Sequence, residues 1–165
     1  MKFNFEMTAP ATPPQSSGPT ILVVDDDPAI RQILVRLLSE ENYQALTAAN
    51  GVEALALADT AKLDLVLLDL NLPVKDGWET FEQLIAQDPL RPVILITAHP
   101  NQFFPALASG AGALLEKPLD FTQLFQTIRA LLKEREQLRR AHRSNAFTYV
   151  PSVGKQRGHK HNYRS

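Results

Sequence analysis

The chain of 165 residues contains no cysteine and no long apolar run. The absence of cysteine excludes a disulfide framework, a thiolate metal site and a cysteine nucleophile. No apolar stretch approaches the roughly 20 residues that a membrane-spanning helix requires. The first nineteen residues also lack the apolar core of a signal peptide. We therefore expect a cytoplasmic protein with no membrane partner.

Apolar residues make up 44% of the chain, which is enough for one packed domain with tails. The charge is unevenly distributed along it. Residues 20–131 hold seven Lys/Arg against fifteen Asp/Glu, whereas residues 132–165 hold nine against two. An acidic body therefore carries a basic C-terminal extension. We interpret this extension as a solvated segment, and binding of nucleic acid or another anionic partner is the minority interpretation.

Short apolar runs alternate with amphipathic helical patterns between residue 20 and about residue 135. Residues 1–19, rich in Pro, Ser, Thr and Ala, show no such pattern and are predicted to be disordered. Two of the runs are apolar on both faces, which is typical of a parallel sheet covered by helices on both sides. The pattern predicts an α/β fold with strands at 20–24, 43–48, 64–69, 92–96 and 112–116.

The last helical pattern begins near Asp120, and its apolar stripe fades after Leu132. Because most faces are charged beyond that point, we expect the helix to end at about 135 or to continue to about 142. Residues 144–165 contain no acid and are predicted to form a basic flexible tail. Helix N-caps are predicted at the Asx residues Asp27 (followed by Pro28), Asn50, Asp76 and Asp120.

Polar side chains stand at the ends of four of the five predicted strands. In an open parallel sheet, ligands bind at the carboxyl ends of the strands. We therefore expect these side chains to meet at one edge, although each alone could be a solvated acid, a strand-end hydroxyl or a neutralising lysine. The set consists of Asp25, Asp26 and Asp27 after the first strand, Asp69 after the third, Thr97 after the fourth and Lys117 after the fifth.

The residue types at this edge indicate a particular chemistry. Clustered carboxylates without nearby His or Cys suit a hard cation such as Mg²⁺, which prefers oxygen ligands. A carboxylate beside Mg²⁺ can attack phosphorus and form an aspartyl phosphate. A lysine and a hydroxyl can then bind the phosphoryl oxygens. Asp27 stands apart, because an Asp directly before a proline is more typical of a helix cap.

With these residues in place, the chain resembles the receiver domain of two-component response regulators. The resemblance covers about residues 20–135. It rests on ILVVDDDPAIR (21–31), LVLLDLNLPVKDG (65–77), LITAH (95–99) and EKPLD (116–120), which occur in that order at family-like spacing. We expect a doubly wound, flavodoxin-like (βα)5 fold whose five parallel strands lie in the order 2-1-3-4-5.

The resemblance implies a role for each acid. Asp69 matches the phosphoacceptor. Asp26 matches the acid that binds Mg²⁺ directly, and Asp25 matches its partner, which often acts through water. Asn71 matches the position whose backbone carbonyl binds the metal. A magnesium site formed by Asp25, Asp26, Asp69 and the Asn71 carbonyl is therefore expected.

The remaining site residues are implied in the same way. Thr97 resembles the switch hydroxyl that moves toward the phosphoryl group, and Lys117 resembles the lysine that pairs with it. Pro118 matches the proline that follows a cis bond in the family. Leu114 occupies a position that is usually aromatic.

A second departure from the family lies between Thr97 and Lys117, which are about two residues closer than is usual. The helix in this interval, roughly residues 102–109, is therefore expected to be short or irregular, and we expect Pro105 to interrupt it.

These observations predict a phosphoacceptor rather than an enzyme with a separate substrate. A histidine kinase or phosphotransfer protein would donate to Asp69, and a downstream protein partner would read the result. Because the thirty-odd residues after the last helix cannot build an output domain, we expect a stand-alone regulator.

Three alternatives remain at this point. A receiver-fold adaptor or phosphorelay intermediate with atypical switching is favoured by Leu114 and the short helix. A haloacid-dehalogenase-type phosphatase would need an acid at position 71, where this chain has Asn71. A flavin-binding module is disfavoured because the first strand–helix loop is acidic where a phosphate would lie.

Overall fold

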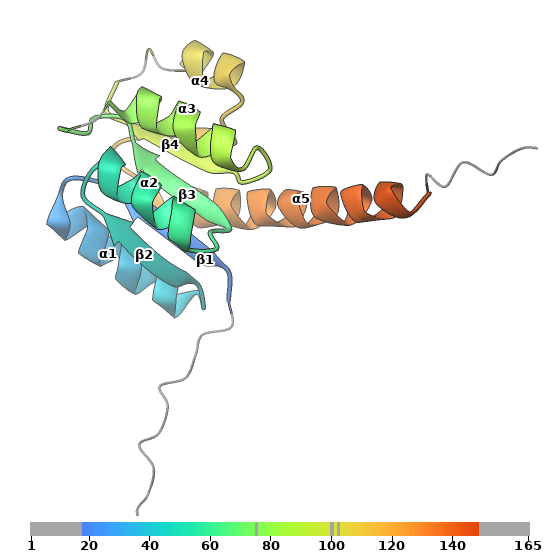
Figure 1. Ribbon diagram of the computed structural model, residues 1–165. Coiled ribbons are helices and arrows are strands. Elements are labelled where there is room, and N and C mark those ends of the chain that lie inside the picture. The colour runs from blue at the N-terminus through green and yellow to red at the C-terminus, as the bar shows by residue number, and fades with distance from the viewer. Residues whose placement is uncertain (1–17, 75, 100, 102, 149–165) are drawn as a thin grey trace, which may run out of the picture.

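Five parallel strands form one sheet, and helices connect each strand to the next (Figure 1). The computed structural model describes residues 18–74, 76–99, 101 and 103–148. The strands are β1 (Thr20–Val24), β2 (Gln44–Ala48), β3 (Leu65–Asp69), β4 (Val93–Thr97) and β5 (Ala113–Glu116), and the helices are α1 (Pro28–Glu40), α2 (Gly51–Thr60), α3 (Gly77–Gln87), α4 (Phe103–Ser109) and α5 (Phe121–Thr148).

The strand order is β2-β1-β3-β4-β5, and every neighbouring pair is parallel. This confirms the predicted doubly wound α/β fold. The reversal of winding between β1 and β3 places the ends of these two strands side by side. Such a switch point is where an open α/β sheet leaves room for a ligand.

Each central strand buries both of its faces. In β3, Leu65 and Leu67 join the core that also contains Leu34 of α1 and Ile128 of α5. The alternate residues of β3 join a second core, which lies beneath α2 and α3 and contains Phe81 of α3. Figure 1 shows α2 and α3 on the face of the sheet opposite α5. Two-sided burial explains the continuous apolar runs, and each fully buried Leu or Ile contributes roughly 1.5–3 kcal/mol.

The predicted helix caps are present and fix how the chain leaves the sheet. The Asp27 carboxylate accepts a hydrogen bond from the Ala29 N–H at 2.8 Å, and Pro28 occupies the first helical position. Asp27 therefore caps α1, as predicted. Asn50, Asp76 and Asp120 likewise accept N–H groups at the starts of their helices.

The start of α3 packs tightly against the chain that leaves β3. A Cβ atom on Gly77 would lie 2.5 Å from the Cα atom of Leu70. Only glycine allows this approach, because any larger residue would push the helix away from the loop. The close contact places the start of α3 directly beside Leu70, the residue that follows Asp69.

Helix α4 is short, as predicted, but the expectation that Pro105 interrupts it is wrong. Pro105 is the third residue of the helix. The N–H groups of the first turn have no partner within a helix, so a proline there removes no hydrogen bond.

Helix α5 is longer than predicted and ends at Thr148. The first residues of the tail predicted over 144–165 are therefore helical, whereas residues 149–165 and most of the predicted disordered segment 1–19 lie outside the described residues. Good helix formers and an i,i+4 pair between Glu136 and Arg140, at 2.8 Å, support the extension. No described helix is both long and apolar enough to span a bilayer.

Arg135 attaches the extended part of α5 to the body of the domain. Its side chain is only 4% exposed. One guanidinium nitrogen donates to the carbonyls of Leu63 and Asp64, and the other lies 2.9 Å from the Asp88 carboxylate. These acceptors belong to the loops before β3 and after α3. Sequence reasoning assigned Arg135 to a charged, solvated stretch and missed this contact.

Replacing Arg135 by Ala should lower the free energy of unfolding by about 3 kcal/mol, because buried carbonyls and an acid lose their donor. The matched control is Arg140→Ala on the same helix, whose side chain is 75% exposed. This control should change stability by less than about 0.5 kcal/mol. Guanidinium denaturation measures both changes. Equal midpoints for the wild-type and Arg135→Ala proteins would contradict the anchoring role.

Candidate functional site

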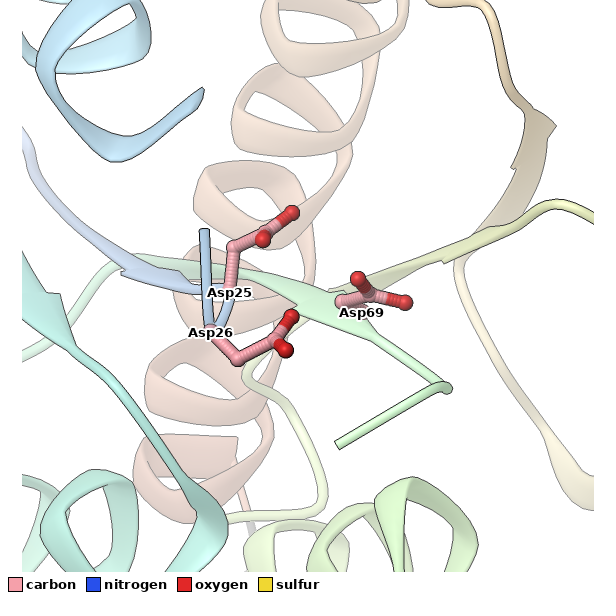
Figure 2. Close-up of side chains that lie close together, drawn as sticks. All are labelled: Asp25, Asp26 and Asp69. Carbon is pink, nitrogen blue, oxygen red and sulfur yellow. The ribbon is translucent and has the colours of Figure 1, made fainter. Parts of the chain in front are cut away.

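Three carboxylates meet at the carboxyl edge of the sheet, as the strand ends predicted. Asp25 and Asp26 follow β1, and Asp69 is the last residue of β3. One oxygen from each carboxylate lies within 4.8 Å of the others. Figure 2 shows the Asp25 and Asp26 side chains extending toward the side on which Asp69 lies, beside the end of β3. The fold therefore brings together acids that are more than forty positions apart in the sequence.

Asp25 and Asp69 are almost fully buried, with 2% and 1% exposure, whereas Asp26 is exposed. Each buried carboxylate accepts a backbone N–H from two residues further on. Asp25 accepts from Asp27 at 2.9 Å, and Asp69 accepts from Asn71 at 2.8 Å. These hydrogen bonds orient the two side chains and stabilise their charged forms.

Lys117 bridges the two buried acids from the end of β5. Its ammonium group lies 2.7 Å from Oδ2 of Asp69 and 3.3 Å from Oδ2 of Asp25. Its backbone N–H donates to the Thr97 carbonyl at 2.8 Å, which holds the end of β5 against β4. The following bond to Pro118 is cis, as the resemblance implied.

Burial and neighbouring charges together determine the electrostatics of the site. Burial raises the pKa of Asp25, and the charge of Asp69 raises it further. The hydrogen bond from the Asp27 N–H and the charge of Lys117 lower it, but the pKa stays raised. Burial by itself would lower the pKa of Lys117, but the hydrogen bond to Asp69 and the charges of both acids outweigh it and raise that pKa. One ammonium therefore faces three carboxylates, and a divalent cation would compensate the remainder.

The donor set fits a hard divalent cation. Carboxylate oxygens are the ligands that Mg²⁺ prefers, and exposed Asp26 leaves a path for the water that Mg²⁺ retains. Asn71 lies in the loop directly after Asp69, with its N–H bound to that carboxylate. The role of its carbonyl as a metal ligand stays a prediction.

Thr97 reaches the same edge, but its hydroxyl is bonded to its own loop. The side chain is fully buried at the end of β4. Its oxygen accepts the His99 N–H at 3.0 Å and donates to the His99 carbonyl at 3.5 Å. Leu114, at the atypical switch position of β5, is half-buried and packs against the core beneath α2 and α3. The phosphate-binding role of Thr97 stays a prediction.

One supporting residue escaped the sequence analysis. Arg31, in the first helical turns of α1, donates to the Asp25 carbonyl at 2.6 Å. The contact ties the acidic loop to the helix that follows it. The available signal was a single basic residue close behind three acids, which the sequence reasoning did not use.

The chain belongs to the response regulator receiver domain family, whose model matches residues 21–129. Among curated relatives, the transcriptional regulatory protein GlrR of Escherichia coli K12 is 35% identical over 116 residues, which is 69% of this chain and 26% of that protein. The alkaline phosphatase synthesis transcriptional regulatory protein PhoP of Bacillus subtilis is 36% identical over 118 residues, which is 70% of this chain and 49% of PhoP. The chain thus spans a quarter to a half of these relatives.

Solved structures give the same family. A CheY-like receiver domain protein from Methanospirillum hungatei superposes with a TM-score of 0.70 at 32% identity, covering 73% of this chain and 98% of that one. The response regulator TrrA of Thermotoga maritima, solved in complex with Mg²⁺ and BeF, gives a TM-score of 0.64 at 34% identity, covering 68% and 98%.

Replacing Asp25 by Asn should weaken Mg²⁺ binding and stabilise the metal-free protein. Its raised pKa means that the folded state holds the Asp25 proton more tightly than the unfolded chain does. The Asp25 carboxyl therefore contributes to folding stability at a pH below its usual pKa. This contribution is lost as the pH rises through the pKa of the folded state. Near neutral pH the charged carboxylate opposes folding. Mg²⁺ affinity should fall by about 10–100-fold, as for ligands that act through water.

Calorimetric Mg²⁺ titration and metal-free thermal unfolding at pH 7 measure the two effects. Asp27→Asn is the matched control, because Asn can still cap α1 and the control should bind Mg²⁺ normally. A variant at Asp25 that binds Mg²⁺ as tightly as the wild type would exclude the site.

Proposed function

We propose that this chain is a phosphoacceptor whose Asp69 receives a phosphoryl group from a histidine kinase or phosphotransfer protein in a Mg²⁺-dependent reaction. The observation that carries this proposal is the position of the Asp69 carboxylate, which contacts Lys117 and lies beside Asp25 and Asp26. Membership of the receiver domain family supports the same role. The chain would assist its own phosphorylation and dephosphorylation without acting on a separate substrate.

In the transfer step, a carboxylate oxygen of Asp69 forms a bond to phosphorus as the bond from phosphorus to the donor imidazole nitrogen breaks. The imidazole leaves with the electron pair of that bond and takes up a proton. Lys117, already hydrogen-bonded to Asp69, is placed to follow the developing charge onto the phosphoryl oxygens. Mg²⁺, held by Asp25, Asp26, Asp69 and the Asn71 carbonyl, would neutralise part of the phosphoryl charge.

Phosphorylation would act as a switch because it changes the charge and the acceptors at Asp69. The added phosphoryl oxygens offer Thr97 a stronger acceptor than the His99 carbonyl, which is now 3.5 Å from the hydroxyl. A hydroxyl that turns toward the phosphoryl group releases the His99 backbone and lets the segment between β4 and α4 rearrange. The rearranged surface would change affinity for a downstream protein partner.

The nature of the output is part of the proposal. We favour a cytoplasmic regulator that acts through protein binding. The curated relatives are named transcriptional regulators, which makes DNA, reached directly or through another domain, the second possible target. The basic segment after Leu132 gives that second route a chemical rationale.

A receiver-fold adaptor or phosphorelay intermediate is the alternative function. It is favoured by Leu114, which lacks the aromatic ring found at this position in the family and packs instead as an ordinary core residue. An adaptor would act mainly by protein binding, with phosphorylation of Asp69 weak or absent, whereas a phosphorelay intermediate would accept the phosphoryl group and pass it on.

Incubation with acetyl phosphate and Mg²⁺ should add the mass of one phosphoryl group to the wild-type protein, and Asp69→Asn should reduce that addition to background. The reason is that the amide has no charged oxygen to attack phosphorus. Intact-mass spectrometry measures the product. Asp76→Asn, which keeps a cap at the start of α3, should behave as wild type. Phosphorylation that survives Asp69→Asn would exclude Asp69 as the acceptor.

A further inference from the structure

Arg91 carries a buried positive charge without an ion-pair partner among the described residues. It lies between α3 and β4 and is 4% exposed. Its Nη2 atom donates to the Leu84 carbonyl at 2.8 Å and to the amide oxygen of Gln87 at 3.4 Å, and both acceptors are neutral. Burial accordingly lowers the pKa of Arg91. A buried guanidinium normally pairs with an anion, because removing its charge from water is costly.

A cavity of about 290 Å³ is lined in part by Arg91 and lies at the edge of the sheet where β4 and β5 begin. Arg91 and Arg135 both line it, and the Nε atom of each is buried without a hydrogen-bond partner. Ile85, Leu131 and Leu138 supply an apolar wall. The cavity is therefore at the opposite end of the strands from Asp69.

Of the three arginines near the cavity, Arg91 is the one without an ion-pair partner among the described residues, although the charge of Asp88 acts on it from further away. Arg135 lies 2.9 Å from the Asp88 carboxylate and 3.7 Å from that of Asp64. Arg139 lies 3.9 Å from the same Asp64 carboxylate. Glu134 also lines the cavity and is exposed. A ligand with one negative charge would offset the charge of Arg91, and Glu134 would repel a doubly charged phosphate more strongly than it repels a monoanion.

We propose that this cavity binds a small aliphatic monocarboxylate. The carboxylate would pair with the Arg91 guanidinium, and the hydrocarbon chain would lie against Leu131 and Leu138. Guanidinium and carboxylate have matching planar geometry, which favours this pairing over other anions. The site is separate from Asp69 and does not depend on the proposed phosphoacceptor function.

Butyrate is the probe, added to the full chain in Mg²⁺-free buffer and followed by amide chemical shifts. Residues 110–112 and 131–138 should shift with a saturable dependence on butyrate. Acetate should bind more weakly, by roughly fourfold for each methylene that it no longer buries. Arg91→Gln should weaken binding at least tenfold, whereas Glu134→Gln should tighten it. Arg129→Gln is the matched control, because Arg129 is an exposed α5 residue paired with Glu41.

A second variant keeps the test decisive if Arg91→Gln fails to fold. Leu138 is 42% exposed at the cavity, so Leu138→Glu should fold and should weaken butyrate binding by adding a like charge. The proposal is overturned if no residue near the cavity shifts, or if Leu138→Glu and Arg91→Gln bind butyrate as the wild type does. Shifts confined to residues 97–99 and 117 would also overturn it, since they would place the carboxylate at the Lys117 site.

Discussion

The ion pairs of Lys117 with Asp69 and Asp25 are the interactions on which the rest of the site depends. They join the ends of three strands, because Lys117 follows β5 while the two acids belong to β3 and the segment after β1. A single ammonium among three carboxylates stabilises the arrangement without neutralising it. The remaining negative charge is of the kind that a divalent cation compensates, and the ion pair itself keeps Asp69 beside a positive group.

The two edges of the sheet perform different tasks. The carboxyl edge collects the acids, Thr97 and Lys117, which are held by backbone N–H groups and by the ion pairs of Lys117. At the opposite edge, Arg135 binds the loops that enter β3 and leave α3, and it thereby makes the extension of α5 part of the folded body. The family model ends at residue 129, so this anchor lies in a part of the chain that the model does not cover. Asp69 is the last residue of β3, so the anchor on the loop before β3 also holds the strand that positions Asp69.

Much of the fold and the convergence of the three acids could be predicted from the sequence. Apolar runs located the strands to within a residue or so, and strand-end acids converge wherever strands are parallel. The proline after Asp27 indicated that this residue caps α1, unlike the two acids before it. Long-range polar contacts could not be predicted, because Arg91 and Arg135 bind mainly backbone carbonyls, which carry no sequence signal. The hydrogen bonds of Thr97 depend on a loop conformation that composition does not specify.

The central claim is that a phosphoryl group at Asp69 reorganises the segment from Thr97 to Lys117. Hydrogen exchange with beryllofluoride and Mg²⁺, which mimic the phosphorylated aspartate, tests this most directly. The predicted result is a change in exchange at the amides of residues 97–99 and 117, where the Thr97 hydroxyl leaves His99 and Lys117 contacts the fluorides. The change should disappear in Lys117→Gln. Unaltered exchange in this segment of the wild-type protein, with beryllofluoride bound at Asp69, would contradict the claim.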